Sequence, residues 1–139
     1  LNKWNVILDT NVIVSAFLSD YDDAATVVVL HMFYDEKINL YYSDEILSEY
    51  EDVLNRKKFD FDKRIIKKFI NLIKENGIKL NPEKIEKEMI DVKDKPFFEL
   101  VMDKNVEEGK LITGNIKHYP KNKFIMTPAE FVEMFKGQI

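Results

Sequence analysis

Three polar residues interrupt an apolar stretch near the start of the chain. In VILDTNVIVSAFL, residues 6–18, a carboxylate, a hydroxyl and an amide follow one another as Asp9, Thr10 and Asn11. Burying such groups without partners costs about 2–7 kcal/mol each, so they must lie at an edge, be satisfied by partners or have a chemical task. Each of them is also a good helix N-cap, but one helix needs only one cap. We therefore expect Asp9 to have a function beyond capping.

A second apolar stretch ends in a similar way. LITGN, residues 111–115, is a predicted strand that runs into Thr113, Gly114 and Asn115. Gly114 permits a tight turn or a close approach of backbone, while Thr113 and Asn115 carry oxygens that can orient water, substrate or a metal ligand. An ordinary strand-to-loop turn is the competing interpretation of this segment.

A further carboxylate precedes the helix predicted to begin at Pro96. At about 100° per residue, Asp94 extrapolates to the same, buried side as Phe97 and Val101. An acid at a helix N-terminus is also stabilised by the helix dipole, by about 0.3–1 kcal/mol, without any catalytic role. Spacing alone does not exclude the neighbouring Asp91.

The helix predicted over residues 44–55 contains several more acids. Glu49 and Glu51 flank its apolar face about equally, so periodicity does not choose between them. Glu45 and Asp52 lie further from that face, and we expect them to be solvated.

Other enzyme chemistries lack their residues. No cysteine is present, which excludes disulfides and thiolate metal sites. His31 lies in an apolar helix and His118 in a loop that could approach the site, and two scattered histidines make a zinc site improbable. What remains is a set of carboxylates, which repel one another unless they are protonated or bridged by cations. Hard oxygen ligands favour Mg²⁺ or Mn²⁺, and such a site best supports attack of water on a phosphodiester.

Short apolar strands alternate with helices along the chain. The predicted strands are 6–9, 40–42, 78–80, 111–113 and 124–126. The predicted helices are 11–18, 24–37, 44–55, 62–76, 96–108 and one that starts with the capping box TPAE, residues 127–130. This alternation predicts an α/β fold, a three-layer α/β/α sandwich with a five-stranded, mainly parallel sheet, in a single domain over residues 1–139. Ligands of such folds bind at the carboxyl ends of strands, where Asp9 would leave the core.

Composition limits the partners and the location. The net charge of −4 argues against a highly basic nucleic-acid coat but not against a nuclease, because acids that hold cations count as negative charge. Without a signal-peptide pattern or an apolar run of about 20 residues, we expect a cytoplasmic protein. A basic cluster around Phe59 and Phe61 is either a solvated face or a surface that steers a polyanion. It consists of Arg56, Lys57, Lys58, Lys63, Arg64, Lys67 and Lys68.

Taken in order, these segments resemble the motifs of the PIN domain family, especially the branch of virulence-associated protein C-like toxins of toxin–antitoxin systems. The four motifs are VILDTNVIVSAFL, YYSDEILSEYEDVL, DVKDKPFFELV and LITGNIKHYP. The match places the acid of the second motif at Glu49 and that of the third at Asp94. Since the motifs occur in the expected order, the resemblance spans essentially the whole chain.

The resemblance implies an endoribonuclease that depends on Mg²⁺ or Mn²⁺. On this match the catalytic residues are Asp9, Glu49 and Asp94, the metal ligands are these three and Asn115, and the residues that position water or substrate are Thr10, Asn11 and Thr113. Many family members have aspartate where this chain has Asn115, and an amide keeps an oxygen ligand but removes a charge, so one or two ions can be held. The toxin branch further implies an RNA substrate, a protein antitoxin that masks the site, and a homodimer.

Other classes of protein share some of these residues. An inactive PIN-like module would bind RNA or protein without cutting, as the missing charge at Asn115 would allow, and a housekeeping RNA-processing nuclease would use the same residues. Haloacid-dehalogenase-like phosphatases need a second aspartate where this chain has Asn11. Response-regulator receivers need a phosphoacceptor on the third strand, where the sequence IKL offers none.

Overall fold

The computed structural model describes residues 3–137 and has an all-parallel five-stranded sheet at its centre. The strands are β1 (Trp4–Leu8), β2 (Ile38–Tyr42), β3 (Ile78–Lys79), β4 (Lys110–Ile112) and β5 (Ile125–Met126). They lie in the order β3-β2-β1-β4-β5. From β1 the chain adds β2 and β3 on one side and then β4 and β5 on the other, so strand order reverses between β1 and β4. Parallel sheets bind ligands at such a point, outside the carboxyl ends of the strands.

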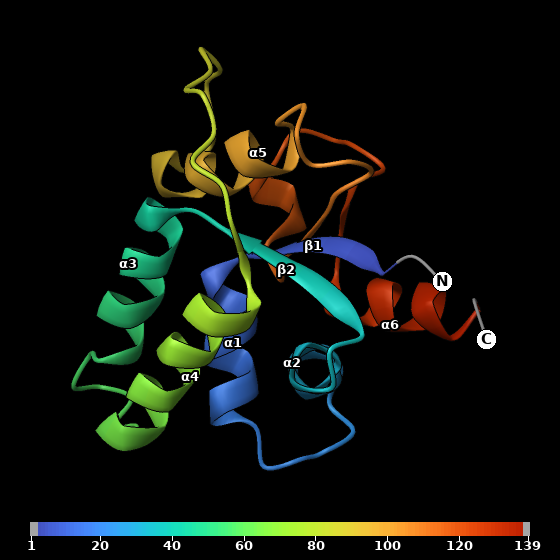
Figure 1. Cartoon of the computed structure of the whole chain (residues 1–139). Helices are drawn as coiled ribbons and strands as arrows, with labels where there is room; N and C mark the ends of the chain where they lie inside the picture. Colours follow the sequence, from blue (N-terminus) through green and yellow to red (C-terminus); the bar gives the residue numbers. More distant parts are fainter. Residues whose placement is uncertain (1–2, 138–139) are drawn as a thin grey trace.

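Helices cover both faces of this sheet. The α-helices are α1 (Thr10–Leu18), α2 (Ala25–Tyr34), α3 (Asp44–Leu54), α4 (Lys63–Asn76), α5 (Lys95–Val101) and α6 (Pro128–Lys136), and two short 3₁₀ turns are η1 (Val92–Asp94) and η2 (Ile116–His118). In Figure 1, α5 lies on one side of β1 and β2, while α1 and α2 lie on the other. The α/β sandwich with a parallel sheet is therefore confirmed, and α6 begins with the predicted capping box.

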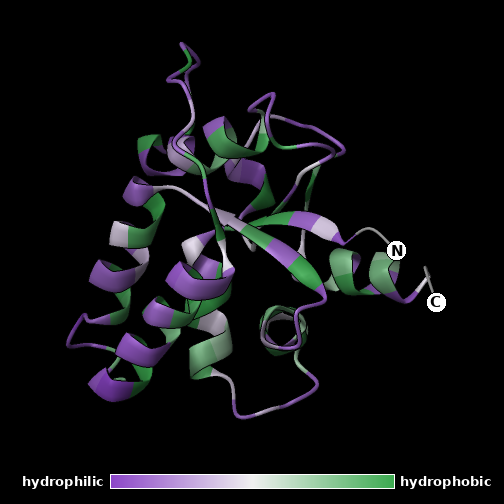
Figure 2. Ribbon diagram, in the orientation of Figure 1, coloured by the Kyte–Doolittle hydropathy of each residue, from purple (hydrophilic) through white to green (hydrophobic). Residues whose placement is uncertain are grey.

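The core forms where the apolar strands meet the apolar faces of the helices. Val6, Ile7 and Leu8 of β1 are fully buried, as expected of a central parallel strand that is covered on both faces. α4 turns Ile66 and Ile70 toward the core, and Figure 2 shows hydrophobic and hydrophilic residues alternating in bands along this helix. Each fully buried side chain of this kind stabilises the fold by about 1.5–3 kcal/mol. No helix within residues 3–137 is long and apolar enough to span a bilayer.

Most predicted boundaries hold to within two residues, but two helices end earlier than predicted. α2 stops at Tyr34 rather than at residue 37, because Glu36 takes a left-handed φ of 58°. α5 stops at Val101, so the helix predicted to residue 108 was wrong. Beyond it the Asp103 side chain accepts a hydrogen bond from the backbone N–H of Asn105 at 2.9 Å. This local bond offers the backbone an alternative to the helix.

Tyr50 fastens α3 to the end of β1, and its removal gives a test of the fold. The ring is fully buried, and the hydroxyl donates a hydrogen bond to the carbonyl of Leu8, the residue before Asp9. Tyr50→Phe leaves that carbonyl without its partner, so we expect the free energy of unfolding to fall by about 1–2 kcal/mol in urea denaturation. Tyr42→Phe is the control, since the Tyr42 ring is also buried but its hydroxyl has no hydrogen bond within residues 3–137. Equal losses in both variants would contradict the assigned role.

Candidate active site

Two polar segments of the sequence meet where strand order reverses. β1 pairs with β4 so that Leu8 lies opposite Ile112. The N–H of Asp9 donates to the carbonyl of Ile112 at 3.0 Å, which places Thr113 directly beside Asp9. Both polar side chains are buried, with Asp9 3% and Thr113 0% exposed. The edge of the sheet thus contains a carboxylate that is almost shut off from solvent.

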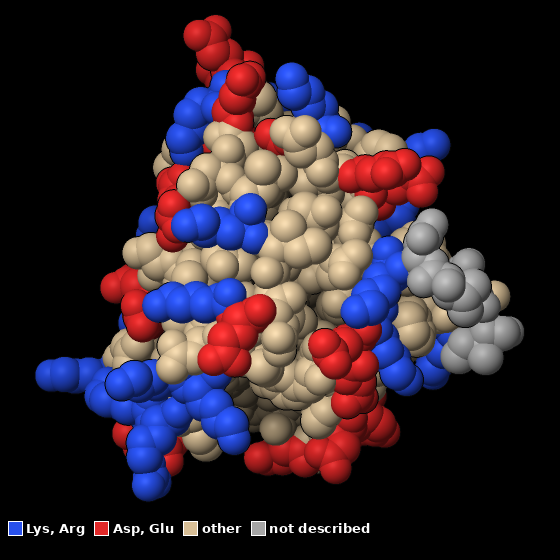
Figure 3. Space-filling view, viewed as in Figure 1, with Lys and Arg blue, Asp and Glu red and all other residues tan. Residues whose placement is uncertain are grey.

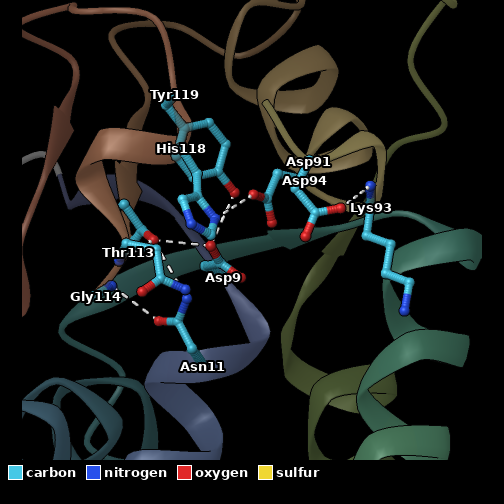
Figure 4. Close-up of polar contacts among 10 residues, drawn as sticks. Asp9, Asn11, Asp91, Lys93, Asp94, Thr113, Gly114, His118 and Tyr119 are labelled. Atoms are coloured by element: carbon cyan, nitrogen blue, oxygen red, sulfur yellow. Dashed lines mark hydrogen bonds and ion pairs between the residues drawn. The ribbon is translucent and has the colours of Figure 1, made fainter. Parts of the chain in front are cut away.

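Asp9 occupies the N-cap position of α1 but does not cap the helix. Its side chain makes no capping hydrogen bond. Instead, Oδ2 accepts hydrogen bonds from the hydroxyls of Thr113 at 2.8 Å and Tyr119 at 2.9 Å, as Figure 4 shows. Two donors on one oxygen fix the orientation of the carboxylate, and Oδ1 accepts no hydrogen bond from the described part of the chain. The capping interpretation of Asp9 does not hold, and one of its oxygens is available to a ligand.

Asn11 ties the ends of β1 and β4 together from the first turn of α1. Its Oδ1 accepts from the N–H of Gly114 at 2.9 Å, and its Nδ2 donates to Thr113 Oγ1 at 3.4 Å. A Cβ at position 114 would come within 3.2 Å of Asn11 Oδ1, so glycine permits this close approach. Asn11 therefore supports Asp9 through Thr113 rather than by direct contact.

Glu49 is the acid of α3 that points toward this edge. Its side chain is half-buried and accepts a hydrogen bond from the hydroxyl of Thr10. Glu51, which the helical periodicity left equivalent, is exposed. The contact between α1 and α3 therefore decides which of the two glutamates lies next to Asp9.

Asp94 occupies the N-cap position of α5 and, like Asp9, makes no capping hydrogen bond. It is buried, and its Oδ2 lies 3.1 Å from Nδ1 of His118. Asp91 is partly exposed and accepts a hydrogen bond from the N–H of Lys93 at 3.0 Å. One potential ligand atom from each of Asp91, Asp94 and His118 lies within 4.8 Å of the others. The two competing aspartates thus belong to one group, with an imidazole as its third member.

The acids oppose one another's ionisation. Burial, followed by the negative charge of Asp9, raises the pKa of Asp94 to about 6, against the opposing effect of His118. Burial also raises the pKa of Glu49, which the Thr10 hydroxyl lowers and Asp9 raises further. The negative charge of Asp9 raises the pKa of both other carboxylates, so the ionisation of Glu49 and of Asp94 depends on that of Asp9. A bound cation would relieve this repulsion and favour the ionised forms.

The predicted ligands interact through charge but do not form one compact group. Within residues 3–137, Asp9, Glu49 and Asp94 are not gathered within 4.8 Å in the way that the group around Asp94 is. Asn115 is exposed and lines a groove together with Asn11. The assignment of Asp9, Glu49, Asp94 and Asn115 as metal ligands therefore stays a prediction.

Two tyrosines hold the site together and were not expected from the sequence. Tyr119 donates its hydroxyl to Asp9, and Tyr50 donates to the carbonyl just before Asp9. Tyr50 lies on the apolar face of a helix and Tyr119 in a loop before a proline, so nothing in the sequence distinguishes them from ordinary core aromatics. His118, which the sequence placed in a loop able to approach the site, does contact Asp94.

An open, parallel α/β sheet of this order, with acids at its carboxyl edge and at the N-termini of the adjoining helices, is typical of a protein that binds a ligand at this edge. The model of the PIN domain matches residues 5–117. Because that match covers most of the 139 residues, the chain belongs to the PIN domain family, whose members are generally metal-dependent nucleases. No match was found among curated proteins.

The residues present fit a divalent cation. Carboxylate oxygens are the ligands that Mg²⁺ and Mn²⁺ prefer. The raised pKa of Asp94 has the direction expected of acids gathered without a counter-charge. Asp91, Asp94 and His118 supply the compact part of the donor set, and Asp9 adds a fixed carboxylate.

Replacing Asp94 tests the cost of ionising a carboxylate that is buried and lies near the charge of Asp9. A folded-state pKa of about 6 against an ordinary value of 3.8 means that the folded protein binds more protons between these values. This group's contribution to stability is therefore lost as pH rises through about 6. In EDTA, Asp94→Asn should remove that loss and raise the melting temperature at pH 7.5 by about 3–5 °C, which corresponds to roughly 1–2 kcal/mol. At pH 4 the difference from the parent should nearly vanish.

The exposed Asp22 provides the matched control. Asp22→Asn should leave the melting temperature unchanged at both pH values. A lower melting temperature of Asp94→Asn at pH 7.5 would contradict the predicted cost of ionising this carboxylate.

Proposed function

We propose that this chain is a divalent-metal-dependent endoribonuclease that hydrolyses RNA phosphodiester bonds. The observation that carries the proposal is the arrangement of Asp9 and Asp94, which occupy helix N-cap positions at the same sheet edge and cap neither helix. Both are buried, and the charge of Asp9 acts on Asp94. Retaining two mutually repelling, buried carboxylates without a capping role is costly unless a cation joins them.

Each residue of the proposed site has a distinct task. Asp9, Glu49 and Asp94 hold the cation, and the exposed amide of Asn115 adds an oxygen ligand when the substrate is present. Asp91 and His118 lie beside Asp94 and complete or orient its coordination. Thr10 positions Glu49 through its hydroxyl. Thr113 and Tyr119 position Asp9 in the same way. Asn11 in turn positions Thr113.

A bound Mg²⁺ or Mn²⁺ supplies a Lewis acid that stabilises charge on the phosphate and lowers the pKa of an attacking water. The protein contributes the fixed geometry. Because the hydroxyls that hold Asp9 are uncharged, they orient its carboxylate and leave its negative charge available.

Asp9→Asn tests the catalytic assignment. The amide retains the shape of the side chain but removes the charge, so metal-dependent cleavage of RNA should fall by about 10²–10³-fold or more, while circular dichroism shows an intact fold. Cleavage is measured with Mg²⁺ or Mn²⁺, with EDTA as the metal-free control, and Mn²⁺ binding by calorimetry gives a second readout. Asp22→Asn should cleave like the parent. If Asp9→Asn cleaves as fast as the parent, the assignment is wrong, and absence of any cleavage by the parent would favour an inactive RNA-binding module.

We further propose that the nuclease is the toxin of a type II toxin–antitoxin pair and acts in the cytoplasm. This rests on the resemblance of the four motifs to the toxin branch, in which an antitoxin masks the site and the toxin often forms a homodimer. Induced expression in a bacterial host should arrest growth within one or two generations, whereas Asp9→Asn should permit growth. A parent protein that cleaves RNA in vitro but leaves growth unaffected would favour an RNA-processing nuclease. A reading frame beside the gene whose product restores growth would identify the antitoxin.

A further inference from the structure

An open groove runs from the candidate active site along α1. Its volume is about 450 Å³. Thr10 and Asn11 form the end next to the acids, and Leu18 and Phe59 form the far end, with Val53 of α3 on the opposite wall. Along α1 this distance is about 12 Å at 1.5 Å per residue. The groove is therefore continuous with the site and longer than a single aromatic ring.

The far end of the groove is an aromatic platform that the core holds in place. The rings of Phe59 and Phe61 stack 5.3 Å apart with an interplanar angle of 7°. The ring centre of Phe61 lies 5.3 Å from that of Phe17 of α1, and the ring centre of Phe17 lies 5.3 Å from that of Phe69 of α4. Asp60, the residue between Phe59 and Phe61 in the sequence, has a left-handed φ of 52°. Phe59 is thus a half-exposed ring in a fixed orientation rather than a mobile loop residue.

Positive charge surrounds this platform although the chain as a whole is acidic. Arg56, Lys57 and Lys58 immediately precede Phe59, and Lys58 Nζ lies 5.1 Å from the centre of the Phe59 ring. Figure 3 shows Lys and Arg side chains gathered at the end of the molecule where α3 connects to α4. The charge of Arg56 also lowers the pKa of Glu49, as a smaller effect than burial, so the basic residues lie close enough to the acids to influence them.

We propose that this groove is a nucleotide subsite for the RNA strand beside the scissile phosphate, in which a base packs against Phe59 and the flanking phosphates meet Arg56, Lys57 and Lys58. The inference rests on the proposed ribonuclease function and extends it to substrate binding. Aromatic rings stack on nucleobases without strong sequence preference, and cations beside them follow the backbone. The Phe59 ring would hold one end of a short stretch of RNA. A cation bound by the carboxylates would hold the other end.

Charge and continuity favour RNA over a protein segment. Arg56 pairs with Asp52 at 3.8 Å, but no ion pair joins Lys57 or Lys58 to an acid within residues 3–137. A purely apolar helix would cover the groove and leave these two lysines without a counter-charge, whereas each nucleotide provides a base and a phosphate together. On the other side of Asn11 and Ser15 a second groove of about 510 Å³ passes Gly114 and Ala24. The two grooves share Asn11 and Ser15, so a strand that lies in both passes the first turn of α1, where Thr10 contacts Glu49. A linear polymer fits this path better than a mononucleotide.

The test measures binding rather than cleavage, in the Asp9→Asn background so that the RNA stays intact. The probes are a fluorescein-labelled eight-residue oligouridylate and an abasic ribose-phosphate oligomer of the same length. Phe59→Ala should weaken binding of the oligouridylate about tenfold, because stacking is lost, and leave binding of the abasic oligomer within about twofold. Phe59→Trp should retain the affinity for both probes.

Lys58→Ala gives the complementary result. The Lys58→Ala variant should bind both oligomers more weakly, and by the same factor. The slope of log Kd against log salt should fall by about one, as expected for the loss of one phosphate contact. Leu18→Ser tests the same groove at a side chain that is 55% exposed, so folding is not at risk. It should weaken the oligouridylate about threefold and not the abasic oligomer.

Phe124 is the matched control for the platform. It is a half-buried phenylalanine with Lys110 Nζ 5.1 Å from its ring centre, but it precedes β5 and lies at the opposite edge of the sheet. Phe124→Ala should leave the affinity for both probes unchanged.

Any other outcome contradicts the proposal of a nucleotide subsite. If Phe59→Ala weakens both oligomers equally, or neither, no base packs on the ring. If it instead changes the oligomeric state in size-exclusion chromatography and leaves RNA binding intact, the groove is a protein interface. In these cases RNA cleavage by the parent still supports the nuclease, whereas a parent that neither binds nor cleaves RNA removes both proposals.

Discussion

Asp9 accepts hydrogen bonds from two hydroxyls at the junction of β1 and β4, and this contact sets the position of the other polar groups at the sheet edge. The parallel pairing places Thr113 beside Asp9 and brings Asn11 within reach of Gly114. Tyr119 closes the junction from the following loop. Because strand order reverses here, no crossover helix covers the gap between the two strands. A buried carboxylate can therefore face a ligand from within a well-packed core.

The partners of the acids are mostly uncharged, and this has a physical consequence. Thr10, Thr113 and Tyr119 donate hydroxyl hydrogen bonds to Glu49 and Asp9. Among the ion pairs in the described chain, none joins either acid to a lysine or arginine. Neutral donors fix a carboxylate without cancelling its charge, whereas a salt bridge would compete with a cation for it. If these acids bind the proposed cation, the site gives up some stability of the metal-free fold in exchange for metal affinity, a trade-off that is common at functional sites.

Helix α1 connects the chemistry to the surface that the substrate would meet. Its first turn presents Thr10 and Asn11 to the acids, and its last turn presents Leu18 to the groove next to Phe59. The same helix packs Phe17 against Phe61 and thus holds the aromatic platform. The chain is acidic overall, with a net charge of −4, yet Lys and Arg side chains gather at the connection from α3 to α4, beside the proposed nucleotide subsite. The distribution of charge, rather than its sum, is what suits a nucleic acid.

The order of the elements and the strand ends at which polar residues occur could be predicted from the sequence alone. Apolar runs that end in Asp9 and Thr113 predict strands that end in polar groups, which must be exposed or have partners; in the structure both side chains are buried and hydrogen-bonded. Helical periodicity left Glu49 and Glu51 equivalent, and only the resemblance of the motif favoured Glu49. In the structure, packing of α3 against α1 distinguishes the two, because Thr10 donates to Glu49 while Glu51 is exposed. The sequence also predicted too long a helix after Pro96, because the local turn at Asp103 outweighs an apolar pattern. Tyr119 and Tyr50 acquired their roles only in the tertiary structure, because a hydroxyl on an apolar ring can find its acceptor only when distant strands and loops have come together.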